Sequence, residues 1–173
     1  GKFQVAIFET GSDQPTSQWN VHSFLEHATV TLIQLHDSGD LVLLGMSDGG
    51  ILFFDLRNKL HSKFAMHTGP VSQLIYQSSA KIWSASTDGS IALWQPSNGK
   101  LLKEHQLPHR VMALAVSDTL MFAADNLYTQ KIWTHRDNKV LAKLDVERGW
   151  LFLKNALFVD NNSKLLTAST KQH

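Results

Sequence analysis

Apolar and polar residues alternate in short runs along the chain, and turn residues separate the runs. Three of these runs are VTLIQL at 30–35, VSQLIY at 71–76 and VMALAV at 111–116. Alternation with a period of two residues is typical of a β-strand with one buried face. No segment keeps a 3.6-residue apolar period over the length that a helix needs. The pattern therefore predicts an all-β protein.

One phrase, built around a tight turn, recurs at intervals of 39 or 40 residues. It reads LVLLGMSDGGILFFDLRN at 41–58, KIWSASTDGSIALWQPSNG at 81–99 and, more loosely, TLMFAADNLYTQKIWTHRDN at 119–138. An alternating run precedes each copy, and a more polar run follows it, at 59–67, 100–107 and 139–144. Each period therefore predicts four short strands separated by turns, which is the signature of a β-propeller blade.

Both ends of the chain predict incomplete copies of this unit. The segment KFQVAIFET at 2–10 fits a third strand, and a loop over 11–20 leads to an outer strand in VHSFLEH at 21–27. The last segment reaches TAST, which matches residues 84–87 of the second copy. We expect three complete blades and two partial ones, with boundaries at 1–26, 27–66, 67–107, 108–144 and 145–173.

The segment from His67 to Gln95 resembles the repeat of WD-repeat β-propellers. It has a histidine before the inner strand, a strand of small residues, Asp-Gly, and an apolar strand that ends in tryptophan. The resemblance implies a ring of about seven blades, so we expect this chain to be part of a larger propeller. It also implies a tetrad of hydrogen-bonded side chains within the blade: His67, Ser84 or Ser86, Asp88 and Trp94.

The tetrad makes physical sense because a buried indole N–H needs an acceptor, and a serine hydroxyl supplies one. The other copies depart from the pattern. In the first, Leu44 and Met46 replace the serines and a phenylalanine replaces the tryptophan. In the third, Met121 and Ala123 stand at the serine positions, although the tryptophan is present. We expect apolar packing to replace the tetrad in both.

Composition excludes several classes of function. The chain has 173 residues, 43% of them hydrophobic and 18% charged, with a net charge of +1, which fits a globular domain. There is no basic run for direct nucleic-acid binding and no apolar run long enough to span a membrane. The absence of cysteine excludes disulfides and thiolate metal sites.

We also expect neither an enzyme nor a cofactor site. The nine histidines fall in no metal-ligand spacing, and there is no Gly-rich phosphate loop. Three aspartates recur at one position of the repeat, Asp48, Asp88 and Asp125. Recurrence favours a structural role, because a catalytic residue need not repeat. His135 falls in a turn, where substitution by alanine should change stability little.

In the resembled family, partners often bind the face where the inner strands begin. The matching positions flank the first valine of each inner strand or precede the turn aspartates: Thr29, Thr31, Ser47, Pro70, Ser72, Thr87, His109, Arg110 and Met112. Arginine is enriched at binding hot spots and makes forked hydrogen bonds. Trp19 either caps a blade or docks a partner, and Trp150 fits a core position.

These observations predict a non-catalytic scaffold that presents propeller faces to other proteins or peptides, with no small-molecule substrate. Two alternatives remain open. One is an accessory domain of a larger signalling enzyme such as a kinase, GTPase or lipid phosphatase. The other is a component of an RNA-processing or ribosomal particle. Each fits an intracellular protein of the cytoplasm or nucleus.

Overall fold

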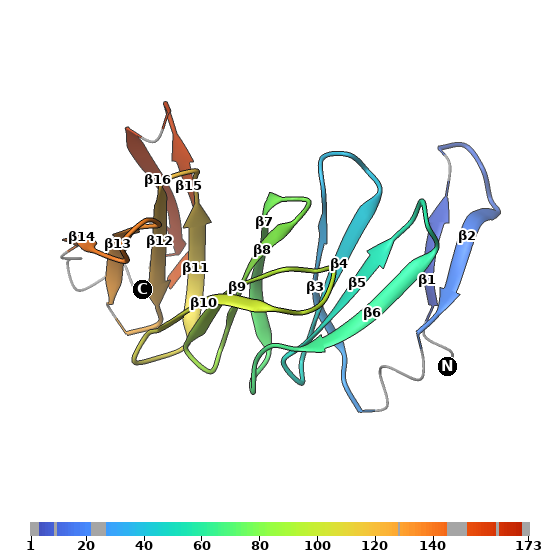
Figure 1. Cartoon of the computed structure of the whole chain (residues 1–173), viewed down its shortest axis with the longest axis horizontal. Coiled ribbons are helices and arrows are strands. Elements are labelled where there is room, and N and C mark those ends of the chain that lie inside the picture. Colours follow the sequence, from blue (N-terminus) through green and yellow to red (C-terminus); the bar gives the residue numbers. More distant parts are fainter. Residues whose placement is uncertain are drawn as a thin grey trace.

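The computed structural model describes residues 4–8, 10–21, 27–127, 129–144, 152–161 and 163–170, and all regular structure among them is β (Figure 1). Three sheets have four antiparallel strands in chain order. Blade I has β3 (Val30–Leu35), β4 (Leu41–Met46), β5 (Gly50–Asp55) and β6 (Leu60–Ala65). Blade II has β7 (Val71–Ser78), β8 (Lys81–Ser86), β9 (Ser90–Trp94) and β10 (Leu101–Gln106). Blade III has β11 (Val111–Val116), β12 (Leu120–Asp125), β13 (Gln130–Thr134) and β14 (Val140–Lys143).

Two hairpins complete the described part of the chain. The N-terminal hairpin pairs β1 (Gln4–Phe8) with β2 (Pro15–Asn20), and the C-terminal hairpin pairs β15 (Phe152–Val159) with β16 (Lys164–Thr170). The hairpins lie at opposite ends of the row of sheets and form separate sheets, so the array is open (Figure 1). The predicted all-β fold of four-stranded antiparallel units is confirmed.

The core lies between successive sheets. Trp94 of blade II packs with Leu43 and Ile51 of blade I, and Trp83 of blade II packs with Met121 and Trp133 of blade III. Similar clusters join blade I to the N-terminal hairpin and blade III to the C-terminal hairpin. Every complete sheet therefore buries both faces, which explains why β4, β8 and β12 consist of nearly continuous buried runs.

The predicted loop over 11–20 is wrong, because its second half forms β2. Pro15 begins the strand, a position that needs no backbone donor. Trp19 pairs with Val5 across the hairpin and makes an edge contact with Phe54 of blade I at a ring distance of 5.9 Å. The segment PTSQWN was not predicted as a strand because most of its residues are polar. In the structure, alternate side chains of this strand face blade I. Most of the segment predicted as the outer strand, 22–26, lies outside the described residues.

An irregularity in register recurs near the start of every inner strand. The pairing shifts between Val30 and Leu32, between Val71 and Gln73, and between Val111 and Ala113. A β-bulge of this kind redirects the side chains near it. Thr31 Oγ1 donates to the carbonyl of Val71 at 2.8 Å, in the next blade. Gln73 Nε2 likewise donates to the carbonyl of Met112 at 3.2 Å, so side-chain hydrogen bonds join the starts of β3, β7 and β11.

The Asp-Gly turns are crossed closely by the chain that leads into the next blade. Gly49 and Gly89 have φ of +86° and +91°, a region that L side chains rarely adopt. A Cβ on Gly49 would lie 2.2 Å from the carbonyl oxygen of His67, and one on Gly89 would lie 2.6 Å from that of Leu107. Glycine is required here by both conformation and space.

Candidate functional site

A chain of hydrogen bonds crosses the interior of blade II. Trp94 Nε1–H donates to Ser84 Oγ at 3.2 Å, and Ser84 Oγ lies 2.7 Å from His67 Nε2. His67 Nδ1 lies 2.6 Å from Ser90 Oγ, which is 2.6 Å from Asp88 Oδ1. Because the carboxylate can only accept and the indole can only donate, the direction is set. The Ser90 hydroxyl donates to Asp88, His67 Nδ1–H donates to Ser90, and Ser84 donates to His67 Nε2.

We call this chain of hydrogen bonds the relay. Its surroundings favour the neutral form of the His67 imidazole. Burial lowers the pKa of His67, and the nearby Asp88 charge only partly offsets that effect. Burial alone would raise the pKa of Asp88, but hydrogen bonds from Ser90 and Thr68 outweigh it and hold the pKa well below its usual value. The relay therefore ends in a carboxylate that stays ionised at neutral pH.

The structure brings four predicted tetrad residues together and adds a fifth. Ser84, and not Ser86, contacts Trp94; the Ser86 hydroxyl instead donates to the carbonyl of Gly69 at 2.8 Å. Ser90, which sequence reasoning missed, stands between His67 and the carboxylate. The sequence feature that could have identified Ser90 is its place two residues after the turn aspartate. This spacing brings the Ser90 hydroxyl close to Asp88 Oδ1.

His67 also joins two blades. Its backbone N–H donates to the carbonyl of Gly49 in blade I, at 3.2 Å, while its side chain belongs to the relay of blade II. Leu107 holds the equivalent place one blade further on, where its N–H donates to the carbonyl of Gly89 at 2.9 Å. Leu107 and Ala123 are both buried, so apolar side chains occupy in blade III the positions of His67 and Ser84.

The predicted partner-face residues lie where the inner strands begin, at the lower edge of the array in Figure 1. We call this edge the proposed partner rim. Thr29, Pro70, His109 and Arg110 are exposed just before β3, β7 and β11. The backbone of Thr29 exchanges hydrogen bonds with Ser47, through its N–H to Ser47 Oγ and its carbonyl from Ser47 N–H.

Other residues of the set are less accessible. Ser72 and Met112 sit at the bulges and are half-buried, and the Ser72 hydroxyl is buried without a partner. Thr31 is exposed, but its hydroxyl is committed to Val71 in the next blade. Thr87 is half-buried, and its N–H donates to the carbonyl of Pro70. The exposed contact area thus comes mainly from the residues before each strand.

Metal-ligating side chains do not cluster within the described ranges. No group of three His, Cys, Asp or Glu side chains there could hold a metal ion. Asp125 Oδ1 accepts from the N–H groups of Leu127 and Thr129, both at 2.9 Å, which stabilises its turn. Trp150 lies outside the described residues. The part of the chain that the structure describes contains no helix that is long and apolar enough to cross a membrane.

Stacked four-stranded antiparallel sheets, Asp-Gly turns and an indole-to-hydroxyl-to-imidazole relay define the blades of a β-propeller. The chain resembles the WD-repeat family of these proteins. No protein-family model matches it. Ribosome biogenesis protein YTM1 of Saccharomyces cerevisiae is 26% identical over 81 residues, which are 47% of this chain and 18% of that protein. The p21-activated protein kinase-interacting protein 1-like of Gallus gallus is 29% identical over 93 residues, 52% of this chain and 25% of that protein.

Both relatives are WD-repeat proteins, and the chain spans a quarter or less of the length of each. Two solved structures share the fold. The computationally designed Ika4 protein matches with a TM-score of 0.69 and 20% identity over 83% of this chain and 86% of that chain. The designed Ika8 protein matches with a TM-score of 0.67 and 21% identity over 82% of this chain and 43% of that chain.

Proposed function

We propose that this chain is a non-catalytic protein-interaction module whose partner binds the proposed partner rim. The observation that carries the proposal is the pair of side-chain hydrogen bonds from Thr31 to Val71 and from Gln73 to Met112. These bonds hold the starts of three inner strands side by side. The exposed residues before them then form one preorganised surface, which lowers the entropic cost of binding.

The chemistry of the buried polar residues supports a structural role for them. The Asp88 carboxylate accepts hydrogen bonds from Thr68 and Ser90, through both backbone and side chain. The His67 imidazole uses both ring nitrogens within the relay. His67 is also buried, at 8% exposure, so a substrate cannot reach its imidazole as it would reach a catalytic base in a pocket.

The names of the two relatives also support a protein-interaction role. One is named as a kinase-interacting protein and the other as a ribosome biogenesis protein, and a surface for other proteins fits both. Accordingly we expect an intracellular protein of the cytoplasm or nucleus. A role as the accessory domain of a signalling enzyme remains an alternative, which the complete reading frame around this chain would test.

The proposal is tested by quantitative affinity purification of the tagged chain and of a variant carrying Thr29→Ala, Thr87→Ala and Arg110→Ala. We expect proteins that co-purify with the wild-type chain to be depleted about tenfold or more, since hot-spot residues dominate binding energy. Lys100→Ala, in an exposed turn of blade II, is the control. If every co-purifying protein stays at its wild-type level in the triple variant, the proposed partner rim is not the binding surface.

The match to the ribosome biogenesis protein favours one specific second candidate, a component of a ribosome-assembly particle. Sucrose-gradient fractionation of cell extract should then show the protein sedimenting with preribosomal particles. We expect its attachment to depend on protein contacts, since the net charge of +1 gives little electrostatic affinity for RNA. Release of the protein from the particles by moderate salt, at which the particles themselves stay intact, would contradict that dependence.

A further inference from the structure

A cleft of about 440 Å³ opens between blades II and III, at the rim opposite the proposed partner rim. Its lining comes from the end of β7, the first half of β8, one residue each of β9 and β10, and residues 118–120 and 134–136 of blade III. Leu93 and Leu120 form apolar walls. The volume falls within the range of ligand pockets, about 300–1,000 Å³.

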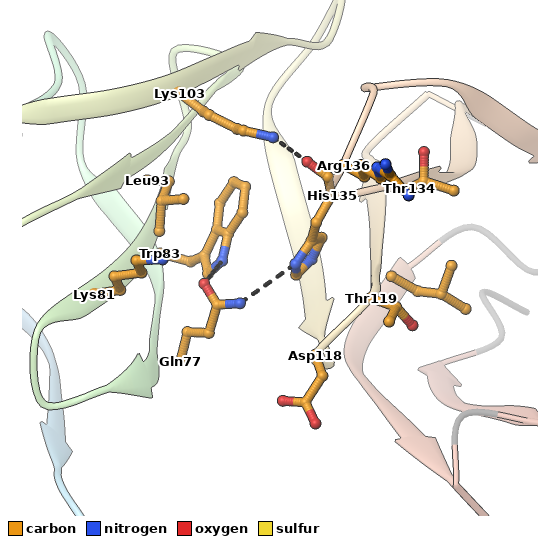
Figure 2. A pocket seen from close by; sticks show the side chains of 11 residues that line it. Gln77, Lys81, Trp83, Leu93, Lys103, Asp118, Thr119, Thr134, His135 and Arg136 are labelled. Carbon is orange, nitrogen blue, oxygen red and sulfur yellow. Dashed lines mark hydrogen bonds between the residues drawn. The ribbon is translucent and has the colours of Figure 1, made fainter.

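The wall of the cleft is held rigidly by aromatic rings and one amide. Trp83 lies 5.5 Å from the ring of His135 and 6.0 Å from that of His105. Trp83 Nε1–H donates to Gln77 Oε1, and Gln77 Nε2 donates to His135 Nδ1, both at 3.3 Å (Figure 2). Because the indole can only donate, this order fixes the orientation of the Gln77 amide. Burial lowers the pKa of His135, so the ring is neutral at pH 7.

The charged residues around the cleft are unbalanced. Lys81, Lys103 and Arg136 line it, against a single carboxylate, Asp118. Lys103 Nζ donates to the carbonyl of His135, which places the ammonium beside Arg136, and Asp118 lies at the far end (Figure 2). Lys81 and Arg136 are exposed, and no ion pair holds either of them within the described residues.

The cleft between blades I and II shows that the fold does not require this charge. It has about 410 Å³ and lies at the same rim, with repeat-equivalent residues in its lining. Leu41 and Phe53 there stand 40 positions before Lys81 and Leu93. Its charged lining residue is an aspartate, Asp55. Two clefts at corresponding places of the repeat therefore differ in the sign of the charge that lines them.

We propose that the cleft between blades II and III binds an acidic peptide segment of a protein partner. Carboxylates of the segment pair with Lys81 on the blade II side and with Arg136 on the blade III side (Figure 2). A neighbouring apolar side chain contacts Leu93 and Leu120. A nucleic acid fits less well, because Trp83 is only 1% exposed and its ring contacts histidines, so it offers no free face for a base. The site is independent of the proposed partner rim.

Fluorescence anisotropy tests the inference with two labelled peptides, one alternating Glu and Leu and one alternating Lys and Leu. We expect the acidic peptide to bind, to weaken with added salt, and to lose about tenfold in affinity in the Lys81→Glu/Arg136→Glu variant. Lys100→Glu, at the same rim beside the other cleft, should bind as the wild type does. Two-dimensional NMR should show the Trp83 indole N–H shifting with the acidic peptide.

Five results would overturn the inference. Four of them are equal binding of the Lys-Leu peptide, an equal loss in Lys100→Glu, an unmoved Trp83 indole, and tighter binding of a single-stranded RNA oligomer than of the acidic peptide. ATP and inorganic phosphate are included as competitors. Displacement of the peptide by phosphate alone, at similar concentration, would assign the site to phosphate rather than to peptide. The purification test with Arg110→Ala does not depend on any of these outcomes.

Discussion

At the scale of single residues, the hydrogen-bond relay in blade II shows how the N–H of one indole finds an acceptor in a buried interface between blades. Trp94 is fully buried and packs against Phe64 of blade I at a ring distance of 5.3 Å. Its N–H is linked through Ser84, His67 and Ser90 to the carboxylate of Asp88. Blade III has a buried tryptophan, Trp133, at the same position with Ala123 in place of the serine, and its ring lies 5.6 Å from that of His105.

Removing a buried ring should separate structural positions from peripheral ones. Trp94→Ala and Phe54→Ala should each lower the free energy of unfolding by about 3–5 kcal/mol, since both rings are 0% exposed. For His135→Ala, the expectation of a near-neutral change is revised, because the ring contacts Trp83 and accepts from Gln77. We expect an intermediate loss, about 1 kcal/mol. Urea denaturation measures all three, and equal losses would contradict this ranking.

The buried imidazole makes stability depend on pH. The pKa of His67 in the folded protein lies below its usual 6.5, mainly because of burial, so the unfolded chain takes up the proton first. The contribution of His67 to the free energy of unfolding is therefore complete above pH 6.5. It decreases as the pH falls below 6.5 towards the pKa of the folded protein. Burial lowers the pKa of His105 and His135 too, and both act in the same direction.

Urea denaturation at about pH 7.5 and about pH 5 measures this loss, above the range where carboxylates titrate. His67→Gln should lose less stability between the two pH values than the wild type, because one buried imidazole is gone. His109→Gln, at an exposed position, should keep the wild-type loss. A pH dependence unchanged in His67→Gln would show that the other histidines account for it.

At the scale of elements, the Asp-Gly turns and the bulges set how blades join. Each turn glycine lies under the backbone that leads into the next blade. The bulges of β3 and β7 each bring a side chain, Thr31 or Gln73, to a carbonyl of the next inner strand. Both features use backbone groups, so the joint between blades survives where the side-chain relay is absent. This explains how blades I and III stack although their sequences depart from the repeat.

Two glycine substitutions separate conformational strain from steric overlap. Gly39 has φ of +76°, and a Cβ added there would have nothing within 4 Å, so Gly39→Ala should cost about 1 kcal/mol from strain. Gly89→Ala should cost clearly more, because its Cβ would also lie 2.6 Å from the backbone oxygen of Leu107. Thermal or urea unfolding of the two variants gives the difference. Equal losses would mean that the backbone at Leu107 moves away from the added Cβ of residue 89 without a further cost in stability.

At the scale of the whole molecule, the array is a row of sheets in which each interior face is covered by its neighbour. The outward face of the C-terminal hairpin is different. Leu157 and Leu166 pair directly across its strands and are 58% and 61% exposed. An exposed apolar pair on an open sheet favours association with another sheet.

We therefore expect the isolated chain to self-associate through this face. Leu157→Lys together with Leu166→Lys should lower the mass measured by light scattering at high concentration. Leu60→Lys is the matched control, since Leu60 is 62% exposed in blade I and lies apart from the hairpin. An unchanged mass in the double variant, or an equal decrease in the control, would place the association elsewhere.

Much of this architecture could be read from the chain alone. Alternation and the 40-residue spacing located the strands of the three blades, because pairing between consecutive strands depends on short-range pattern and turn chemistry. Sequence pattern missed β2, whose few apolar residues are ordered by contact with blade I, and it left Ser84 and Ser86 undecided. The insertion of Ser90 in the relay, the bonds between blades and the charge of the cleft were decided only by the tertiary structure. These depend on which side chains meet across sheets, and residues some forty positions apart meet only after the sheets have stacked.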